Sequence, residues 1–349
     1  MIVLQIWILV STIVNDGSLT RYFGPAITSV VSIMIVGILA QTGTGCLFHF
    51  IRYLRNYLTL LFVLNFITSL DFIHIFFQID TSILGIDNRW IFFYLPWIAT
   101  VFFVSTIKNG HASWVCWLAW LMATVHLTMA WSVGAMMTFY AWPAIWCVGF
   151  LYLKKSKRKR LSATFLIIGA ILLNFVLISG LLIDALSFLF TGILDKDMTL
   201  SGRTLLWNYV LNQVGDDPLF GAGVLSFDQD RSSFGEASGH RVNHPHNFLL
   251  NIMYHGGVIA GVLFIILMFL AAKGCERTHC KSFGLSLYTS LACIIIASLA
   301  DTLDFSLFYI ILGIAFHAPL FDAWCSFASD CSKNNSSSEW AEGNKANGC

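Results

Sequence analysis

Basic and imidazole side chains lie at both ends of the longest polar stretch of this chain. Arg203 lies near the start of the stretch, and His244 and His246 lie at its end. A guanidinium presents a planar fork of donors that fits phosphate oxygens, and an imidazole exchanges protons near neutral pH. His246 and Asn247 come directly before an apolar run, where the N–H groups of a helix N-terminus would favour an anion. These residue types predict a site that holds a phosphate-bearing group and removes the proton of a hydroxyl.

A metal site is the alternative interpretation of the same histidines. His240, His244 and His246 have a spacing that a transition metal could use. Pro245 interrupts any helix face that they could share, and no cysteine lies nearby. We therefore expect neither a metal nor another cofactor at this site.

The polar stretch contains a helix that would position Arg203. Ser201 is a suitable N-cap for a helix that begins near Arg203 and runs to Val214. We expect this helix to lie at a membrane surface, because it has an apolar face that consists of Leu205, Leu206, Tyr209 and Val210.

Turn-forming and acidic residues follow this helix. Asp216-Asp217-Pro218 ends it, because the residue before a proline avoids helical geometry. Gly221-Ala222-Gly223 predicts a tight turn, and two spaced glycines alone are a weak signal for a phosphate loop. We expect Asp228 and Asp230 to be solvated charges of the loop.

The composition places this polar stretch in a membrane protein. The chain has 349 residues, 57% hydrophobic and 11% charged, whereas a soluble domain carries about 25% charged residues. The net charge of +1 gives no bulk attraction to nucleic acid. The expected fold class is an all-α polytopic membrane protein with about ten transmembrane helices. The apolar runs that predict them are 1–14, 25–40, 57–79, 90–107, 113–130, 134–153, 161–190, 247–272, 283–300 and 303–322.

Basic residues set the expected orientation, because cytoplasmic loops carry an excess of lysine and arginine. The strongest cluster, KKSKRKR at 154–160, is placed in the cytoplasm together with the start of the chain. Cys275 and Cys280 also fall on cytoplasmic segments, where thiols stay reduced. The expected parts are N-terminal transmembrane helices (1–190), an extracytoplasmic catalytic loop (191–246), C-terminal transmembrane helices (247–325) and a polar cytoplasmic tail (326–349).

Three motifs in order carry a resemblance to a known family. They are SGRTLLW at 201–207, DDPLFGAG at 216–223, and His246-Asn247 with nine residues before Gly257. LGIDNRW at 84–90 adds a weaker match. Together they resemble the O-antigen ligase and Wzy-type polymerase family, bacterial membrane enzymes that transfer glycans carried on undecaprenyl diphosphate. The close match covers about residues 201–261.

The resemblance implies a metal-independent glycosyltransferase in the bacterial inner membrane, with a fold similar to the membrane part of lipid-dependent glycosyltransferases. Its partners would be an undecaprenyl-diphosphate-linked glycan, an acceptor glycan and membrane lipids. The catalytic residues would be His246 as the base and Arg203 on the diphosphate. The expected substrate-binding residues are Asn247, Arg241, His244, Arg89 and Trp207.

Two positions depart from the family pattern. Val133 stands where a second arginine is expected, so Arg89 or Arg241 would have to supply that charge, or the enzyme is impaired. Ala260 replaces a glycine, and it still permits close helix packing. We favour a polymerase for capsule, exopolysaccharide or O-antigen assembly over a ligase that acts on a lipid core.

Two other classes of protein stay open. A transporter or flippase would use charged residues near its spans, and the candidates are Asp71, His74, Asp184 and Asp301. A scaffold subunit without chemistry is the remaining alternative.

Overall fold

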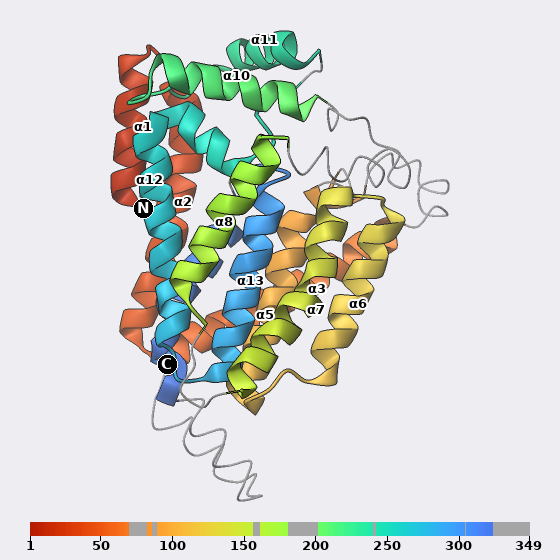
Figure 1. The fold of residues 1–349 in the computed structure, drawn as a ribbon. Coiled ribbons are helices and arrows are strands. Elements are labelled where there is room, and N and C mark those ends of the chain that lie inside the picture. The colour runs from red at the N-terminus through yellow and green to blue at the C-terminus, as the bar shows by residue number, and fades with distance from the viewer. Residues whose placement is uncertain are drawn as a thin grey trace, which may run out of the picture. The chain divides into compact units, whose positions relative to one another are not determined.

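The computed structural model describes residues 1–69, 82–85, 89–155, 161–180, 202–239, 242–303 and 305–323 (Figure 1). These residues form twelve α-helices and one short 3-10 helix, and they contain no β-strand. The predicted all-α fold is therefore confirmed. The helices are α1 (Ile2–Val14), α2 (Leu19–Thr42), α3 (Thr44–Thr68), α5 (Ile91–Asn109), α6 (Trp114–Met129), α7 (Val133–Lys154), α8 (Ala163–Ile178), α10 (Arg203–Asp216), α11 (Phe227–Ser238), α12 (Phe248–Arg277), α13 (Lys281–Ser298), α14 (Ser306–Phe316) and η3 (Ala318–Phe321).

Five of the described helices are long and apolar enough to cross a membrane. They are α2, α5, α7, α12 and α13. Four more apolar helices, α1, α6, α8 and α14, are shorter than a full span. A polytopic membrane protein is confirmed, and the count of about ten spans stays a prediction.

The predicted span 57–79 is shifted along the chain. The helix α3 begins at Thr44 and ends at Thr68, and residues 70–81 lie outside the described part. The helix therefore includes Arg52 and Arg55, which precede the predicted span. In the structure, both arginines lie within the helix and are largely exposed or half-buried, so they do not interrupt it.

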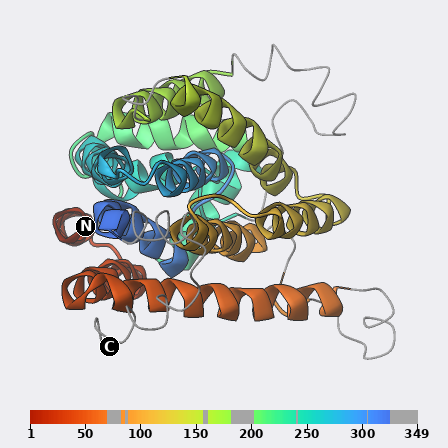
Figure 2. The same ribbon diagram turned by 90° about the horizontal axis from the view of Figure 1, so that it is seen from below.

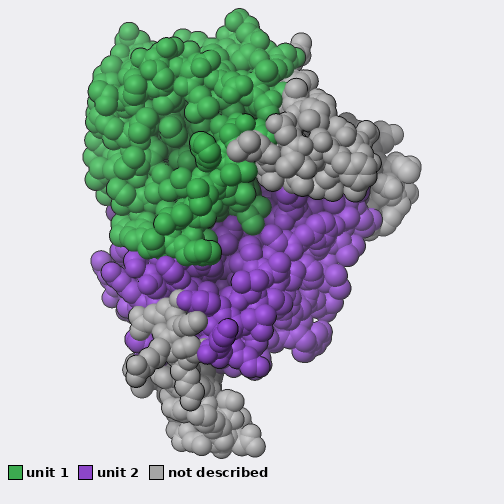
Figure 3. Space-filling model, viewed as in Figure 1, with its two compact units in different colours: residues 1–31, 164–270, 295–306 green, residues 32–163, 271–294, 307–349 purple. Residues whose placement is uncertain are grey.

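The chain divides into two compact units, which are coloured in Figure 3. Unit 1 comprises residues 1–31, 164–270 and 295–306, and unit 2 comprises residues 32–163, 271–294 and 307–349. The boundaries fall inside α2, α12 and α13 and at the starts of α8 and α14. The predicted division into four successive parts concerns membrane topology and stays a prediction.

Unit 2 contains a chain of packed helices. In it α3 packs on α5, α5 on α6 and α6 on α7 (Figure 2). His126 of α6 is buried and hydrogen-bonded through both ring nitrogens, to Tyr94 Oη at 2.8 Å and Ser69 Oγ at 2.7 Å. Satisfied buried polar groups of this kind specify one packing arrangement.

Cys280 in unit 2 departs from the expectation of a reduced thiol. Cys46 and Cys280 are both disulfide-bonded, whereas Cys275 is a buried free thiol. The reducing cytoplasm that the basic residues predict for these segments disfavours such bonds.

Unit 1 holds the described part of the polar loop. The helix α10 packs with α11 (Figure 1). A buried apolar cluster joins them to the start of α12; its members are Leu206, Trp207, Val210, Val214, Phe234, Leu250 and Tyr254. The predicted helix from Arg203 to Val214 is confirmed and ends at Asp216.

The buried face of α10 is rotated from the predicted one. Trp207 and Val214 lie in the cluster, whereas Leu205 is 47% exposed. Gly202 occupies the N-cap position, and Ser201 lies outside the described residues. The prediction of solvated acids was wrong for Asp230, which is fully buried on α11.

The long helix α12 is broken at two glycines. Gly256 (φ −150°, ψ 21°) and Gly257 (φ 65°, ψ −167°) leave helical geometry and expose backbone groups. The turn at 217–223 meets these groups: Ala222 N donates to Tyr254 O at 2.7 Å, and Val258 N donates to Pro218 O at 2.8 Å.

This docking explains the glycines of the turn better than a phosphate loop does. A Cβ on Gly221 would lie 2.5 Å from Tyr254 O, and Gly221 has a positive φ of 63°. The N–H groups of Gly221 and Ala222 are already bonded to Asp217 O and Tyr254 O. The turn therefore fixes the broken helix, as irregular backbone inside a membrane protein requires.

Candidate active site

The His244–Asn247 segment enters α12 in a constrained conformation. His246 has a φ of +50°, a left-handed backbone that costs a non-glycine residue about 1–3 kcal/mol. Such strain persists only where the surroundings impose it, and it gathers at functional sites. The surrounding structure therefore imposes the backbone conformation of His246.

Asp301 faces His246 from the connection between α13 and α14. Its Oδ1 lies 3.4 Å from His246 Nδ1 and 4.0 Å from His244 Nδ1. Within the described part of the chain, His246 Nδ1 is buried and receives no hydrogen bond of good geometry. A carboxylate there favours the tautomer with its proton on Nδ1, which leaves the Nε2 lone pair free to accept a proton.

His244 is held as a neutral imidazole. Its Nδ1 accepts a 3.3 Å hydrogen bond from the His246 backbone N–H, and the two ring centroids are 4.1 Å apart. Burial, followed by the charge of His246, lowers the pKa of His244 to about 4; Asp301 opposes this shift. At neutral pH the proton therefore lies on Nε2, which is a hydrogen-bond donor.

Asp301 is ionised at neutral pH. Burial raises the pKa of its carboxyl, but the close approach of the His246 and His244 imidazoles lowers it further than burial raises it. The net pKa is below the ordinary value of a carboxyl. A negative charge therefore faces the two imidazoles, and it would stabilise a protonated His246.

Arg203 adds a positive charge at the N-terminus of α10. Burial lowers the pKa of Arg203, and the charge of Asp301 opposes this shift. A guanidinium stays protonated at neutral pH in any protein environment. The helix dipole disfavours a cation at an N-terminus, so the two positive features together suit an anion. Arg203 stands one helical turn before Trp207 on α10, and Trp207 donates to Pro245 O between the two histidines.

Trp207 and Asn247 support the histidine segment from inside the protein. Trp207 Nε1 donates to Pro245 O at 2.9 Å. Asn247 accepts from Leu250 N at 3.1 Å as a helix cap, and it donates to Asn174 Oδ1 at 3.1 Å. Both side chains are buried. That they bind substrate stays a prediction, and the observed bonds hold the histidine segment in place.

The remaining predicted residues lie elsewhere. Arg89 is exposed and belongs to unit 2, and Arg241 lies outside the described residues. The structure therefore brings together Arg203, His244 and His246, and it adds Asp301. The sequence offers one signal for Asp301, a charge between two apolar runs, and that signal favours a transporter.

The same histidines and Asp301 are of the types that bind transition metals. The potential ligand atoms of His244, His246 and Asp301 lie within 4.8 Å of one another. The nearby charge of Arg203 opposes a cation there, whereas an imidazole–carboxylate pair can exchange protons without a metal. We therefore interpret the cluster as proton-handling groups.

The described helices are those of a polytopic membrane protein, and the site combines two imidazoles, a carboxylate and a guanidinium. A family model described as O-Antigen ligase matches residues 112–265, which places this segment in the O-antigen ligase family and confirms the resemblance. The matched range includes Arg203, His244 and His246, while Asp301 follows it along the chain. No curated protein matches the chain, and no solved structure matches it.

Proposed function

We propose that the chain is a metal-independent membrane glycosyltransferase that moves a glycan from undecaprenyl diphosphate to a sugar hydroxyl outside the cytoplasm. The observation that carries the proposal is the contact between His246 and Asp301, with Arg203 at the start of the helix whose Trp207 bonds the histidine segment. The family match supports glycan transfer at the level of ligase or polymerase.

In the proposed reaction, His246 removes the acceptor proton. The hydroxyl oxygen attacks the anomeric carbon, its proton passes to His246 Nε2, and the bond between that carbon and the phosphate oxygen breaks. Asp301 stabilises the resulting imidazolium, and Arg203 holds the charge that develops on the departing diphosphate. Attack from the face opposite the leaving group inverts the anomeric configuration.

His244 has a separate role in this proposal. Its neutral ring donates from Nε2, which suits a sugar or phosphate oxygen. Because the His244 ring is uncharged, it can bind this oxygen without disturbing the interaction between Asp301 and His246. It thereby orients the substrate while His246 acts as base.

We favour a polymerase, in which the acceptor is another lipid-linked repeat. The family description favours a ligase, in which the acceptor is a lipid core. Both reactions use the same donor and the same base. Supplying purified protein with the lipid-linked donor and each acceptor in turn separates them, because only one acceptor is extended.

The experiment for the shared chemistry uses Arg203→Ala and His246→Ala in cells that make the polymer. Both variants should leave single repeat units and abolish longer chains. Arg231→Ala, an exposed arginine of α11, is the control and should make normal chains. Full-length polysaccharide from both active-site variants at normal protein abundance would refute the proposal. Activity that requires an added divalent metal after chelation would refute metal independence.

A further inference from the structure

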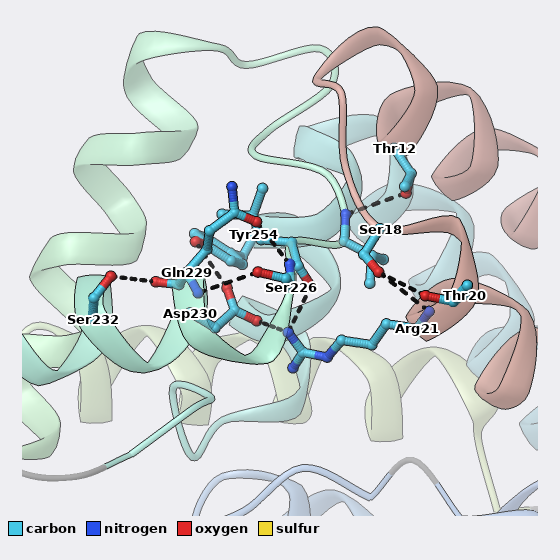
Figure 4. Close-up of polar contacts among 11 residues, drawn as sticks. Thr12, Ser18, Thr20, Arg21, Ser226, Gln229, Asp230, Ser232 and Tyr254 are labelled. Atoms are coloured by element: carbon cyan, nitrogen blue, oxygen red, sulfur yellow. Dashed lines mark hydrogen bonds and ion pairs between the residues drawn. The ribbon is translucent and has the colours of Figure 1, made fainter.

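Arg21 joins the start of α2 to the polar loop and to α12 (Figure 4). Its Nη1 donates to the carboxylate of Asp230, and to Leu225 O at 2.8 Å. Its guanidinium carbon lies 4.1 Å from the ring centroid of Phe227, within cation–π range. Tyr254 donates its hydroxyl to the other carboxylate oxygen of Asp230 at 3.3 Å. One carboxylate therefore links α2, α11 and α12.

This set of contacts, the Arg21–Asp230 clasp, is buried. The Asp230 side chain is 1% exposed and the Arg21 side chain 17%. Removing such ions from water costs several kcal/mol each, so a buried pair is weak evidence for stability. Arg21 also stands in the first turn of α2, where the helix dipole disfavours a cation. The Arg21–Asp230 pair is therefore better explained by its fixing of α2, α11 and α12 in one arrangement than by a gain in stability.

The clasp holds the helix that leads to the histidines. Ser226 and Gln229 form a capping box that fixes the start of α11. Phe234 of the same helix packs in the buried cluster with Trp207, whose indole N–H holds Pro245. The chain reaches the His244 segment a few residues after α11 ends.

The turn between α1 and α2 binds the segment just before α11. Ser18 N donates to Val224 O at 2.7 Å, and Val224 N donates to Thr12 Oγ1 at 3.2 Å (Figure 4). Thus α1 and α2 hold the loop through backbone bonds at Val224 and through the clasp at Asp230. Arg21 lies outside the segment that the family model matches.

We propose that Arg21 and Asp230 are positioning residues for the transfer reaction. The clasp fixes α11 against α12, and through Phe234 and Trp207 it fixes the backbone that carries His246. In this proposal, α1 and the start of α2 contribute to catalysis by holding α11 in position. The kinetic consequence of this inference rests on the proposed function, whereas its structural consequence does not.

Asp230→Asn tests the clasp in the full-length protein, because it keeps the shape and removes the charge. Asp228→Asn is the matched control, an exposed acid in the first turn of the same helix. We expect Asp230→Asn to lower kcat about 10- to 100-fold with little change in the KM for donor, because a small displacement of a catalytic group has this effect. Hydrogen exchange at 242–247 should become faster in Asp230→Asn and stay unchanged in Asp228→Asn.

Arg21→Gln and the double variant test whether the two residues act as one unit. The double variant should be no worse than the more severe single variant, since contacting residues are not additive. If Asp230→Asn fails to fold, Arg21→Lys replaces it and should show the faster exchange at 242–247. The proposed role of the clasp would be refuted by unchanged hydrogen exchange at 242–247 in the folded variants. Losses of kcat that add in the double variant would also refute it. An active His246→Ala would refute the proposed function and leave the exchange test of the clasp intact.

Discussion

Replacing Asp301 by asparagine removes the charge that faces His246 while keeping its size. The two reactive atoms, His246 Nδ1 and Asp301 Oδ1, are 3.4 Å apart. Coulomb attraction between unit charges at that distance is about 5 kcal/mol at an effective dielectric of 20 and about 1 kcal/mol in water. Both side chains are about one quarter exposed, so we expect about 2–3 kcal/mol of stabilisation of the protonated His246. That corresponds to a loss of about 30- to 160-fold in kcat.

The assay is single-turnover transfer from a lipid-linked donor to an acceptor by purified protein, so that product release does not hide the chemical step. Asp301→Glu should recover part of the rate, because it restores the charge at a changed distance. Asp216→Asn, which alters an exposed acid at the end of α10, should behave as wild type. If Asp301→Asn transfers within about twofold of the wild-type rate at equal abundance, Asp301 does not support the base.

Three further changes test other parts of the site. Trp207→Phe removes the bond to the histidine segment and should cost about 1 kcal/mol of stability and lower kcat, as thermal denaturation and turnover would show. Gly257→Ala should sharply reduce membrane abundance, because its φ is +65° and a Cβ would strike backbone atoms; Gly215→Ala, with open space, should not. The pKa of His244 is lowered to about 4 by burial, so the unfolded chain takes up a proton first as pH falls below about 6.5. As the pH falls from about 6.5 to about 4, the Tm should therefore decrease, and it should decrease less steeply in His244→Gln. Equal slopes of Tm against pH in the two proteins would contradict the lowered pKa.

The bounds of α10, the helix that carries Arg203, could be predicted because neighbouring residues determine them. The start of α10 near Arg203 follows from the apolar residues that begin there, although Gly202 rather than the expected Ser201 occupies the N-cap position, and Asp217-Pro218 marks its end. The role of Gly257 was not predictable, because it depends on a turn some forty residues earlier. The spacing in α10 also predicted a buried Leu205, which is exposed in the structure. Tertiary packing, and not spacing alone, decides which face of the helix is buried.

The missed parts of the site share one physical cause. Asp301 and Arg21 lie far from His246 along the chain, and no local spacing reveals their contacts. The helix α11 was missed because its buried residues, such as Phe234, are few among polar neighbours. The sequence pattern predicts a solvated acid at Asp230. The fold shows that Arg21 pairs with its carboxylate, which offsets the cost of burying the charge.

Separating donor binding from transfer tests the central assignment most directly. The measurement is the affinity of purified protein for the lipid-diphosphate donor together with single-turnover transfer, in wild type, Arg203→Ala and His246→Ala. The assignment predicts that Arg203→Ala weakens donor binding and transfer together, while His246→Ala binds donor normally and transfers nothing. Transfer by His246→Ala at the wild-type rate, or undiminished donor binding and transfer by Arg203→Ala, would contradict it.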